Sequence, residues 1–184
     1  ERLMNTRLEE NLIEPEKIGR AKRLDDANGR YIEFLKNTFP SKQRLEGLKV
    51  VIDCANGASY LSAPIVFWEL GADVIQIGVK PDGLNINKKC GSTDTSLLSE
   101  KVKENKADIG LALDGDGDRL IICDENGDIV DGDQILGLLA LQLKENGTLK
   151  NNEVVGTLMT NVGLEKKLGD NSIGLIRAPV GDRY

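Results

Sequence analysis

Apolar and polar positions along the chain predict short strands that alternate with amphipathic helices. Apolar residues, many of them β-branched, gather in short runs that end in turns rich in glycine and asparagine, as buried strands do. Between these runs, apolar residues recur every three or four positions, which is typical of helices. The expected strands lie at 48–55, 72–79, 107–114, 152–160 and 172–180, with a hairpin at 119–130. The expected helices lie at 24–39, 59–72, 96–106, 133–146 and 161–170.

This order of elements predicts an α/β protein made of two consecutive βαβ-type domains with mixed sheets, the second incomplete. The hairpin, turned at Asn126-Gly127, should supply the antiparallel element of the first sheet. The boundaries predicted are 1–24 for the end of a preceding domain and a linker, 25–130 for the first α/β domain, and 131–184 for part of the next.

A weak internal similarity accompanies this division. "VVIDCANGASYL" and "VVGTLMTNVGLEKKL" share paired valines, then an asparagine and a nearby glycine, then a helix. Either the two segments are a true repeat with a boundary near Asp131, or they show only the ordinary likeness of βαβ units, and the sequence leaves both interpretations open.

Composition narrows the class of protein. The net charge of −6 argues against a general nucleic-acid binder, and we find no run apolar enough to span a membrane and no signal-peptide pattern. Cys54, Cys90 and Cys123 are odd in number and form no CxxC pair, so we expect reduced thiols that pack inside a cytoplasmic protein. The chain has no histidine, which excludes histidine acid–base chemistry within it and disfavours zinc.

Both ends of the sequence suggest a piece of a longer polypeptide. The chain begins at Glu1 rather than at methionine, and "APVGDRY" follows directly on an expected strand. We therefore expect further domains outside these residues.

The segment "LALDGDGDRL" carries the main candidate chemistry. Asp114, Asp116 and Asp118 alternate with glycines after a strand, a spacing that aims three hard oxygen donors at one point. We therefore interpret the segment as a site for Mg²⁺, Mn²⁺ or Ca²⁺ rather than as a plain acidic turn. An EF-hand is excluded, although Glu125 falls at its twelfth position, because Arg119 replaces the glycine at the sixth and the flanks are strand-like. Arg119 beside a divalent cation favours a bound phosphate and hence phosphoryl transfer.

The extended segment "LALDGDGDRLIICDENGDIVDGDQI" closely resembles the metal loop of the α-D-phosphohexomutases. "PDGLNINKKCGST" resembles the branch of the bacterial phosphoglucosamine mutases, and "GRAKRLDDANGRYIEFLK", "VVIDCANGA" and "VGDRY" also look like that family. The resemblance covers nearly the whole chain and implies domain II of the family at 25–130 and the first part of its domain III at 131–184.

The resemblance implies an enzyme of amino sugar metabolism that interconverts glucosamine 6-phosphate and glucosamine 1-phosphate through a bisphosphorylated sugar. Asp114, Asp116 and Asp118 would hold Mg²⁺, and Arg119 would contact the phosphate of a phosphoserine that lies outside this chain. A weaker transfer assigns a sugar-binding loop of domain III to the last residues, namely Gly181, Asp182 and Arg183.

The family's phosphoserine loop, sugar-specificity loop and fourth domain find no match in the sequence, so we expect the isolated chain to be inactive. Its expected partners are a sugar phosphate, the remaining domains of the parent enzyme and, in a homodimer, a second copy of that enzyme. Two alternatives stay open, namely another sugar phosphomutase or a metal-binding module without catalysis.

We interpret "VIDCANGA" as a joint between strand and helix, and Lys88-Lys89 as a solvated pair.

Overall fold

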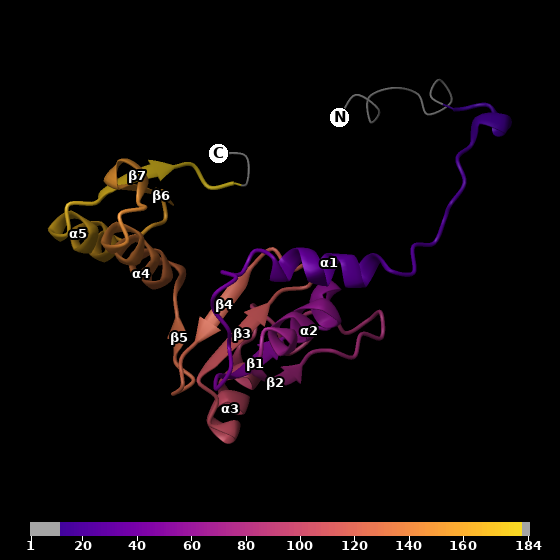
Figure 1. Ribbon diagram of the computed structural model, residues 1–184, viewed down its shortest axis with the longest axis horizontal. Helices are drawn as coiled ribbons and strands as arrows, with labels where there is room; N and C mark the ends of the chain where they lie inside the picture. The colour runs from indigo at the N-terminus through magenta and orange to yellow at the C-terminus, as the bar shows by residue number, and fades with distance from the viewer. Residues whose placement is uncertain (1–11, 182–184) are drawn as a thin grey trace.

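The computed structural model describes residues 12–181, which form two α/β units with separate sheets (Figure 1). The first unit has a five-stranded sheet in the order β2-β1-β3-β4-β5, and the second has the pair β6-β7. The strands of the first sheet are β1 (Lys49–Asp53), β2 (Asp73–Ile77), β3 (Ile109–Leu113), β4 (Leu120–Cys123) and β5 (Ile129–Val130). Before them, residues 12–26 contain only the 3₁₀ turn η3 (Pro15–Lys17).

The first sheet is mixed, as the sequence predicts. Its three leading strands are parallel, because β1 pairs in parallel with both β2 and β3. The hairpin then turns back, so that β3 pairs antiparallel with β4, and β4 with β5. Parallel strands place their carboxyl ends at one edge of the sheet, which is where ligands bind in open α/β sheets.

Helices cover both faces of this sheet. Alternate residues of β1 point to opposite sides: Val51 packs with α3 (Ser96–Asn105), whereas Val50 and Ile52 pack with the residues around α2 (Ser62–Glu69). The short turn η4 (Ala58–Tyr60) leads into α2, and Gly71 follows the end of that helix with φ +106°, a conformation that glycine adopts without strain. The first unit is thus a three-layer α/β/α sandwich.

The helix predicted at 24–39 is present as α1 (Ala27–Lys36), but only some of its apolar side chains are buried. Tyr31 and Phe34 lie mostly exposed and stack on each other with ring centroids 6.5 Å apart. Ile32 is the buried residue of this helix, because α1 packs mainly against α2 rather than against a sheet.

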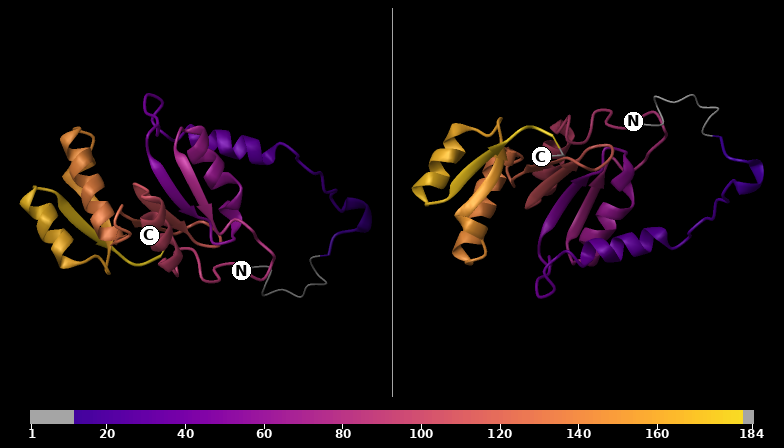
Figure 2. Two further views of the ribbon diagram at one scale, coloured as in Figure 1. Left: turned by 90° about the horizontal axis from the view of Figure 1, so that it is seen from below. Right: turned by 90° about the horizontal axis from the view of Figure 1, so that it is seen from above.

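The second unit starts directly after the hairpin. Asp131 caps α4 (Gly132–Glu145): its side chain accepts the Gln134 backbone N–H, and the Gln134 side chain accepts the Asp131 backbone N–H. The 3₁₀ turn η5 (Lys150–Asn152), β6 (Glu153–Thr157), α5 (Val162–Asp170) and β7 (Gly174–Ala178) follow. β6 and β7 are parallel, and α4 and α5 pack side by side against one face of the pair (Figure 2).

The two segments that looked alike in sequence use their asparagines differently. Asn56 adopts a left-handed backbone conformation (φ +49°) and its side chain accepts the Lys80 backbone N–H. Asn161 instead has an extended backbone and caps α5 by accepting the Leu164 backbone N–H. The shared asparagine therefore reflects no shared local geometry, although both segments are βαβ units.

In the part of the chain that the structure describes, no helix is long and apolar enough to cross a membrane. The three cysteines are all buried and free, which agrees with their expected packing role.

Candidate metal centre

The three aspartates of the "DGDGD" segment lie in the loop between β3 and β4, at the carboxyl edge of the parallel strands. Asp114 directly follows β3 and is only 2% exposed, whereas Asp116 and Asp118 are exposed. One carboxylate oxygen from each lies within 4.8 Å of the others. The structure thus brings together the three side chains that the sequence proposes as ligands.

Asp114 folds the loop back on itself. Its Oδ1 accepts the backbone N–H groups of Gly117 (3.2 Å) and Arg119 (3.1 Å), and its Oδ2 accepts the Nε–H of Arg119 at 2.8 Å. Gly117 has φ +78°, a conformation that glycine adopts without strain, so the loop can make this sharp return. Burial alone would raise the pKa of Asp114, but the hydrogen bonds from Arg119 outweigh it and hold that pKa well below its usual range.

Asp118 shows that the site lacks positive charge. Its pKa is raised, first by desolvation and then by the negative charges of Asp114 and Asp116. Arg119 offsets part of this charge, since its Nε lies 3.7 Å from Asp118 as well as beside Asp114. Three carboxylates facing one arginine leave a net negative site, which a cation would stabilise.

The geometry fits a small divalent cation. Mg²⁺ binds oxygen at about 2.1 Å, so ligands on opposite sides of the ion lie about 4.2 Å apart. The three aspartate oxygens lie within 4.8 Å of one another, and the side chains of Asp116 and Asp118 are exposed, so they can move the short distance that coordination of one ion requires. Asp114, Asp116 and Asp118 therefore form a suitable donor set for Mg²⁺ or Mn²⁺.

Two other loops of the first unit, which contain Ala58 and Ser92, support the aspartate loop through backbone hydrogen bonds. The backbone N–H of Ser92 donates to the carbonyl oxygen of Leu113 (3.0 Å), and that of Ala58 donates to Gly115 (2.8 Å). Gly57 lies so close that a Cβ there would sit 2.2 Å from the Gly115 oxygen. The turn at "VIDCANGA", expected from its sequence to be only a joint between strand and helix, therefore also supports the aspartate loop.

Among the other residues named from the sequence, those that the structure describes do not belong to this cluster. Gly181 follows β7 and is exposed, and Asp182 and Arg183 lie outside the described residues. Lys88 and Lys89 are exposed, as a solvated pair would be.

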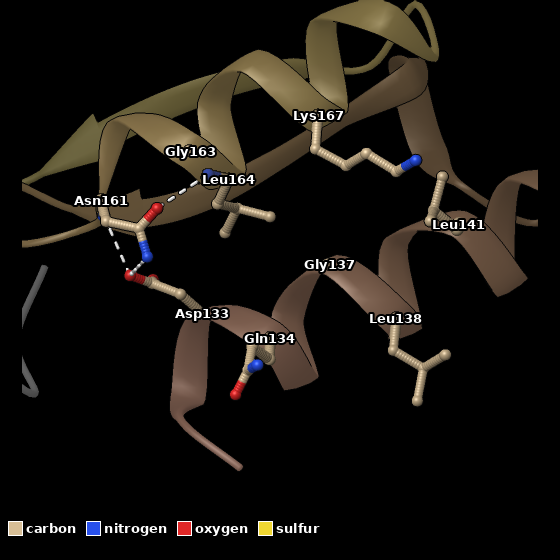
Figure 3. A pocket seen from close by; sticks show the side chains of 9 residues that line it. All are labelled: Asp133, Gln134, Gly137, Leu138, Leu141, Asn161, Gly163, Leu164 and Lys167. Atoms are coloured by element: carbon tan, nitrogen blue, oxygen red, sulfur yellow. Dashed lines mark hydrogen bonds between the residues drawn. The ribbon is translucent and has the colours of Figure 1, made fainter.

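A separate groove of about 470 Å³ lies between α4 and α5 (Figure 3). Its floor is apolar, with Leu138, Leu141 and Leu164 among the lining residues. At one end, Asp133 is already engaged, because its Oδ2 accepts both the backbone N–H and the side-chain amide of Asn161. This polar pair therefore serves the packing of two helices and leaves the aspartate loop as the candidate reactive site.

Comparison with protein families places both units. Residues 29–127 match the family model described as phosphoglucomutase/phosphomannomutase, alpha/beta/alpha domain II. Residues 131–184 match the corresponding alpha/beta/alpha domain III. The two matches together cover most of the chain and follow the two sheets of the structure.

Curated relatives of the same kind align with the full chain. The proteins named phosphoglucosamine mutase from Rhodospirillum rubrum and from Nitrobacter winogradskyi are each 54% identical over 184 residues, which is 100% of this chain and 41% of each relative. The chain thus spans about two fifths of the length of these relatives.

Solved structures share the fold. A phosphoglucomutase/phosphomannomutase family protein from Burkholderia thailandensis superposes with a TM-score of 0.70 at 24% identity, over 84% of this chain and 33% of that one. A putative phosphomannomutase from Thermus thermophilus gives a TM-score of 0.69 at 20% identity, over 89% of this chain and 38% of that one.

Proposed function

Since the chain belongs to the phosphoglucomutase/phosphomannomutase family, we propose that it is the central part of a phosphoglucosamine mutase and supplies the metal loop of that enzyme. The parent enzyme would interconvert glucosamine 6-phosphate and glucosamine 1-phosphate through a bisphosphorylated sugar. The 54% identity to curated phosphoglucosamine mutases over the full chain supports this choice of sugar.

One observation carries the proposal: three carboxylates converge within 4.8 Å beside an arginine whose outer nitrogens face no partner among residues 12–181. Asp114, Asp116 and Asp118 would hold Mg²⁺, which would offset negative charge on a phosphoryl group during transfer. The proposed domain limits are 25–130 for domain II and 131–184 for the first part of domain III.

The contacts of Arg119 support two separate roles for its side chain. Its Nε–H is committed to Asp114, which fixes the direction of the side chain, while the side chain as a whole is 63% exposed. The terminal nitrogens make no hydrogen bond within residues 12–181, so each would donate to a phosphate oxygen, a geometry for which guanidinium is well suited. We assign Arg119 the binding of the phosphate that faces the metal.

Metal binding by this chain tests the site directly. A Mn²⁺ titration, followed by loss of the free-ion paramagnetic resonance signal, should show one site in the wild-type chain and much weaker binding in Asp116→Asn. Asp128→Asn is the matched control, because it removes the same charge from an exposed position on the β4–β5 turn. Equal binding by Asp116→Asn and Asp128→Asn would refute the assignment.

A hybrid enzyme tests the activity. In it, this chain replaces the matching 41% of the Rhodospirillum rubrum relative. We expect the hybrid to form glucosamine 1-phosphate from glucosamine 6-phosphate, and Arg119→Ala within it to lower kcat on the order of 10²-fold, as removal of a donor to a transition-state oxygen does. The chain alone should show no turnover. A folded but inactive hybrid would instead favour a module without catalysis.

A further inference from the structure

Asp53 is a buried carboxylate at the carboxyl end of β1, outside the group of candidate metal ligands. It is 0% exposed. Its Oδ1 accepts the backbone N–H of Ala55 at 2.9 Å, and its Oδ2 accepts that of Gly91 at 2.7 Å. Gly78 approaches so closely that a Cβ there would lie 2.5 Å from Oδ1. A buried carboxylate is costly to desolvate, and these two hydrogen bonds offset part of that cost while they tie Asp53 to two separate loops.

Each of the two N–H donors begins a connection to the aspartate loop. Ala55 opens the turn that ends at Ala58, whose N–H donates to the carbonyl oxygen of Gly115. Gly91 precedes Ser92, whose N–H donates to the carbonyl oxygen of Leu113. Leu113 and Gly115 are the immediate neighbours of Asp114, so the two connections grip the backbone on both sides of that ligand.

The backbone of these two loops would not keep its shape unaided. Ala55 has φ +53° and Asn56 has φ +49°, in the left-handed region that residues with a side chain disfavour. Gly91 has φ +78°, and a Cβ there would meet the Ala55 side chain at 2.6 Å and the Leu113 oxygen at 2.8 Å. The turn at Ala55 and Asn56 is therefore strained and both loops are closely fitted, and Asp53 supplies the acceptors that hold the two loops in place.

We propose that Asp53 is a positioning residue for the metal loop: by accepting one hydrogen bond from each loop, it fixes the backbone on both sides of Asp114 and thereby sets cation affinity. Asp53 does not itself touch the ion. The inference rests on the proposed metal site, because an effect on affinity requires that the aspartate loop bind a cation.

Asp53→Asn tests the inference with little change in volume. The amide offers one oxygen acceptor and one NH₂ group, so one of the two backbone N–H donors loses its partner. We expect Mn²⁺ to bind about 10- to 100-fold more weakly, as when the partner that orients a metal ligand is removed. Gly91→Ala is a second variant that displaces the same loop without changing any charge, and it should weaken Mn²⁺ binding in the same direction.

Val102→Ala is the matched control. Val102 is fully buried on α3 in the same unit and contacts none of the three loops through a hydrogen bond, so its truncation lowers stability without loosening the site. All variants are compared under conditions where circular dichroism shows them folded. An affinity that falls equally in Val102→Ala and Asp53→Asn would reduce Asp53 to a general stabilising role and overturn the proposal.

Amide hydrogen exchange separates this inference from the proposed function. In Asp53→Asn, the amides of Ala58 and Ser92 should exchange faster than in the wild-type chain and in Val102→Ala, with or without metal. Unchanged exchange at both amides would overturn the positioning role. Absence of Mn²⁺ binding by the wild-type chain would instead count against the metal site, and the exchange result would still decide whether Asp53 orders the loop.

Discussion

The backbones of Gly57 and Gly115 lie so close together that alanine at position 57 should destabilise the first unit, whereas alanine at the open position of Gly29 should not. A Cβ at Gly57 would lie 2.2 Å from the Gly115 oxygen and 2.6 Å from its Cα, whereas ordinary contacts begin at 3.4 Å. Gly57 itself has a β-region backbone (φ −106°), so alanine meets no conformational penalty there. The cost of Gly57→Ala therefore comes from the clash alone.

The clash has a calculable size. The turn and the aspartate loop must separate by about 1 Å, which also stretches the bond from the Ala58 N–H to the Gly115 oxygen beyond hydrogen-bonding range. Overpacking of this kind costs about 1–3 kcal/mol, and the lost hydrogen bond costs about 0.5–1.5 kcal/mol. We expect Gly57→Ala to lower the free energy of unfolding of the first unit by about 2–4 kcal/mol.

Urea unfolding measures this change. Trp68 is the only tryptophan and lies on α2, so its fluorescence anisotropy reports on the first unit. With a typical urea dependence of about 1.5 kcal/mol per molar, the midpoint should fall by roughly 1–3 M. Gly29→Ala is the control: Gly29 lies within α1, a Cβ there would meet nothing within 4 Å, and the substitution should raise stability by up to about 1 kcal/mol. An unchanged midpoint for Gly57→Ala would refute the packing argument.

The titrating groups give two further predictions. The folded pKa of Asp114 is depressed, so its contribution to stability is present above the ordinary aspartate pKa and is lost as the pH falls below that value toward the folded pKa. Urea midpoints measured in the presence of a chelator should therefore fall less between pH 5 and pH 3 in Asp114→Asn than in the wild-type chain. Parallel pH dependence in the two proteins would contradict the depressed pKa. Burial raises the pKa of Cys54 to about 11 and also raises the pKa values of Cys90 and Cys123. At pH 8, a thiol-specific disulfide reagent should therefore label the folded chain slowly, whereas it should label three thiols in urea. Rapid labelling of the folded chain would contradict the burial of the cysteines.

Local patterns were enough to predict the elements and the candidate ligands. The apolar runs that become β1 and β3 are short and β-branched or aliphatic, and each is followed by turn residues, so their type follows from periodicity. The three aspartates lie within five consecutive residues, so their convergence depends only on the conformation of one glycine-rich loop. Sequence spacing is therefore enough to suggest the cluster, although the backbone of the loop is also held by contacts with other loops.

The support behind the loop depends on residues that are far apart in the chain. Ala58 and Ser92 reach Gly115 and Leu113 through backbone groups, and backbone groups leave no signature in side-chain type. The available signals were Gly57 and Gly91, which are small where two backbones meet. Without the strand order, neither glycine can be assigned a partner.

The sequence also could not predict which face of α1 is buried. The helix is short, and its apolar residues lie on more than one side, so periodicity permits more than one buried face. Packing against α2 selects Ile32 and leaves Tyr31 and Phe34 exposed. Tertiary contact decides such cases, because the intrinsic preference is nearly balanced.

The strand order gives two aspartates opposite tasks at one edge of the sheet. β1 and β3 are neighbouring parallel strands, so Asp53 and Asp114 both leave the sheet at its carboxyl edge. Desolvation acts on both carboxylates, but only Asp114 has a guanidinium beside it, and their pKa values consequently move in opposite directions, up for Asp53 and down for Asp114. Asp114 stays charged next to two exposed carboxylates that can share a cation. Asp53 is closed off from solvent, and its only described partners are the N–H groups of the two loops, so it can order the site but cannot join its chemistry.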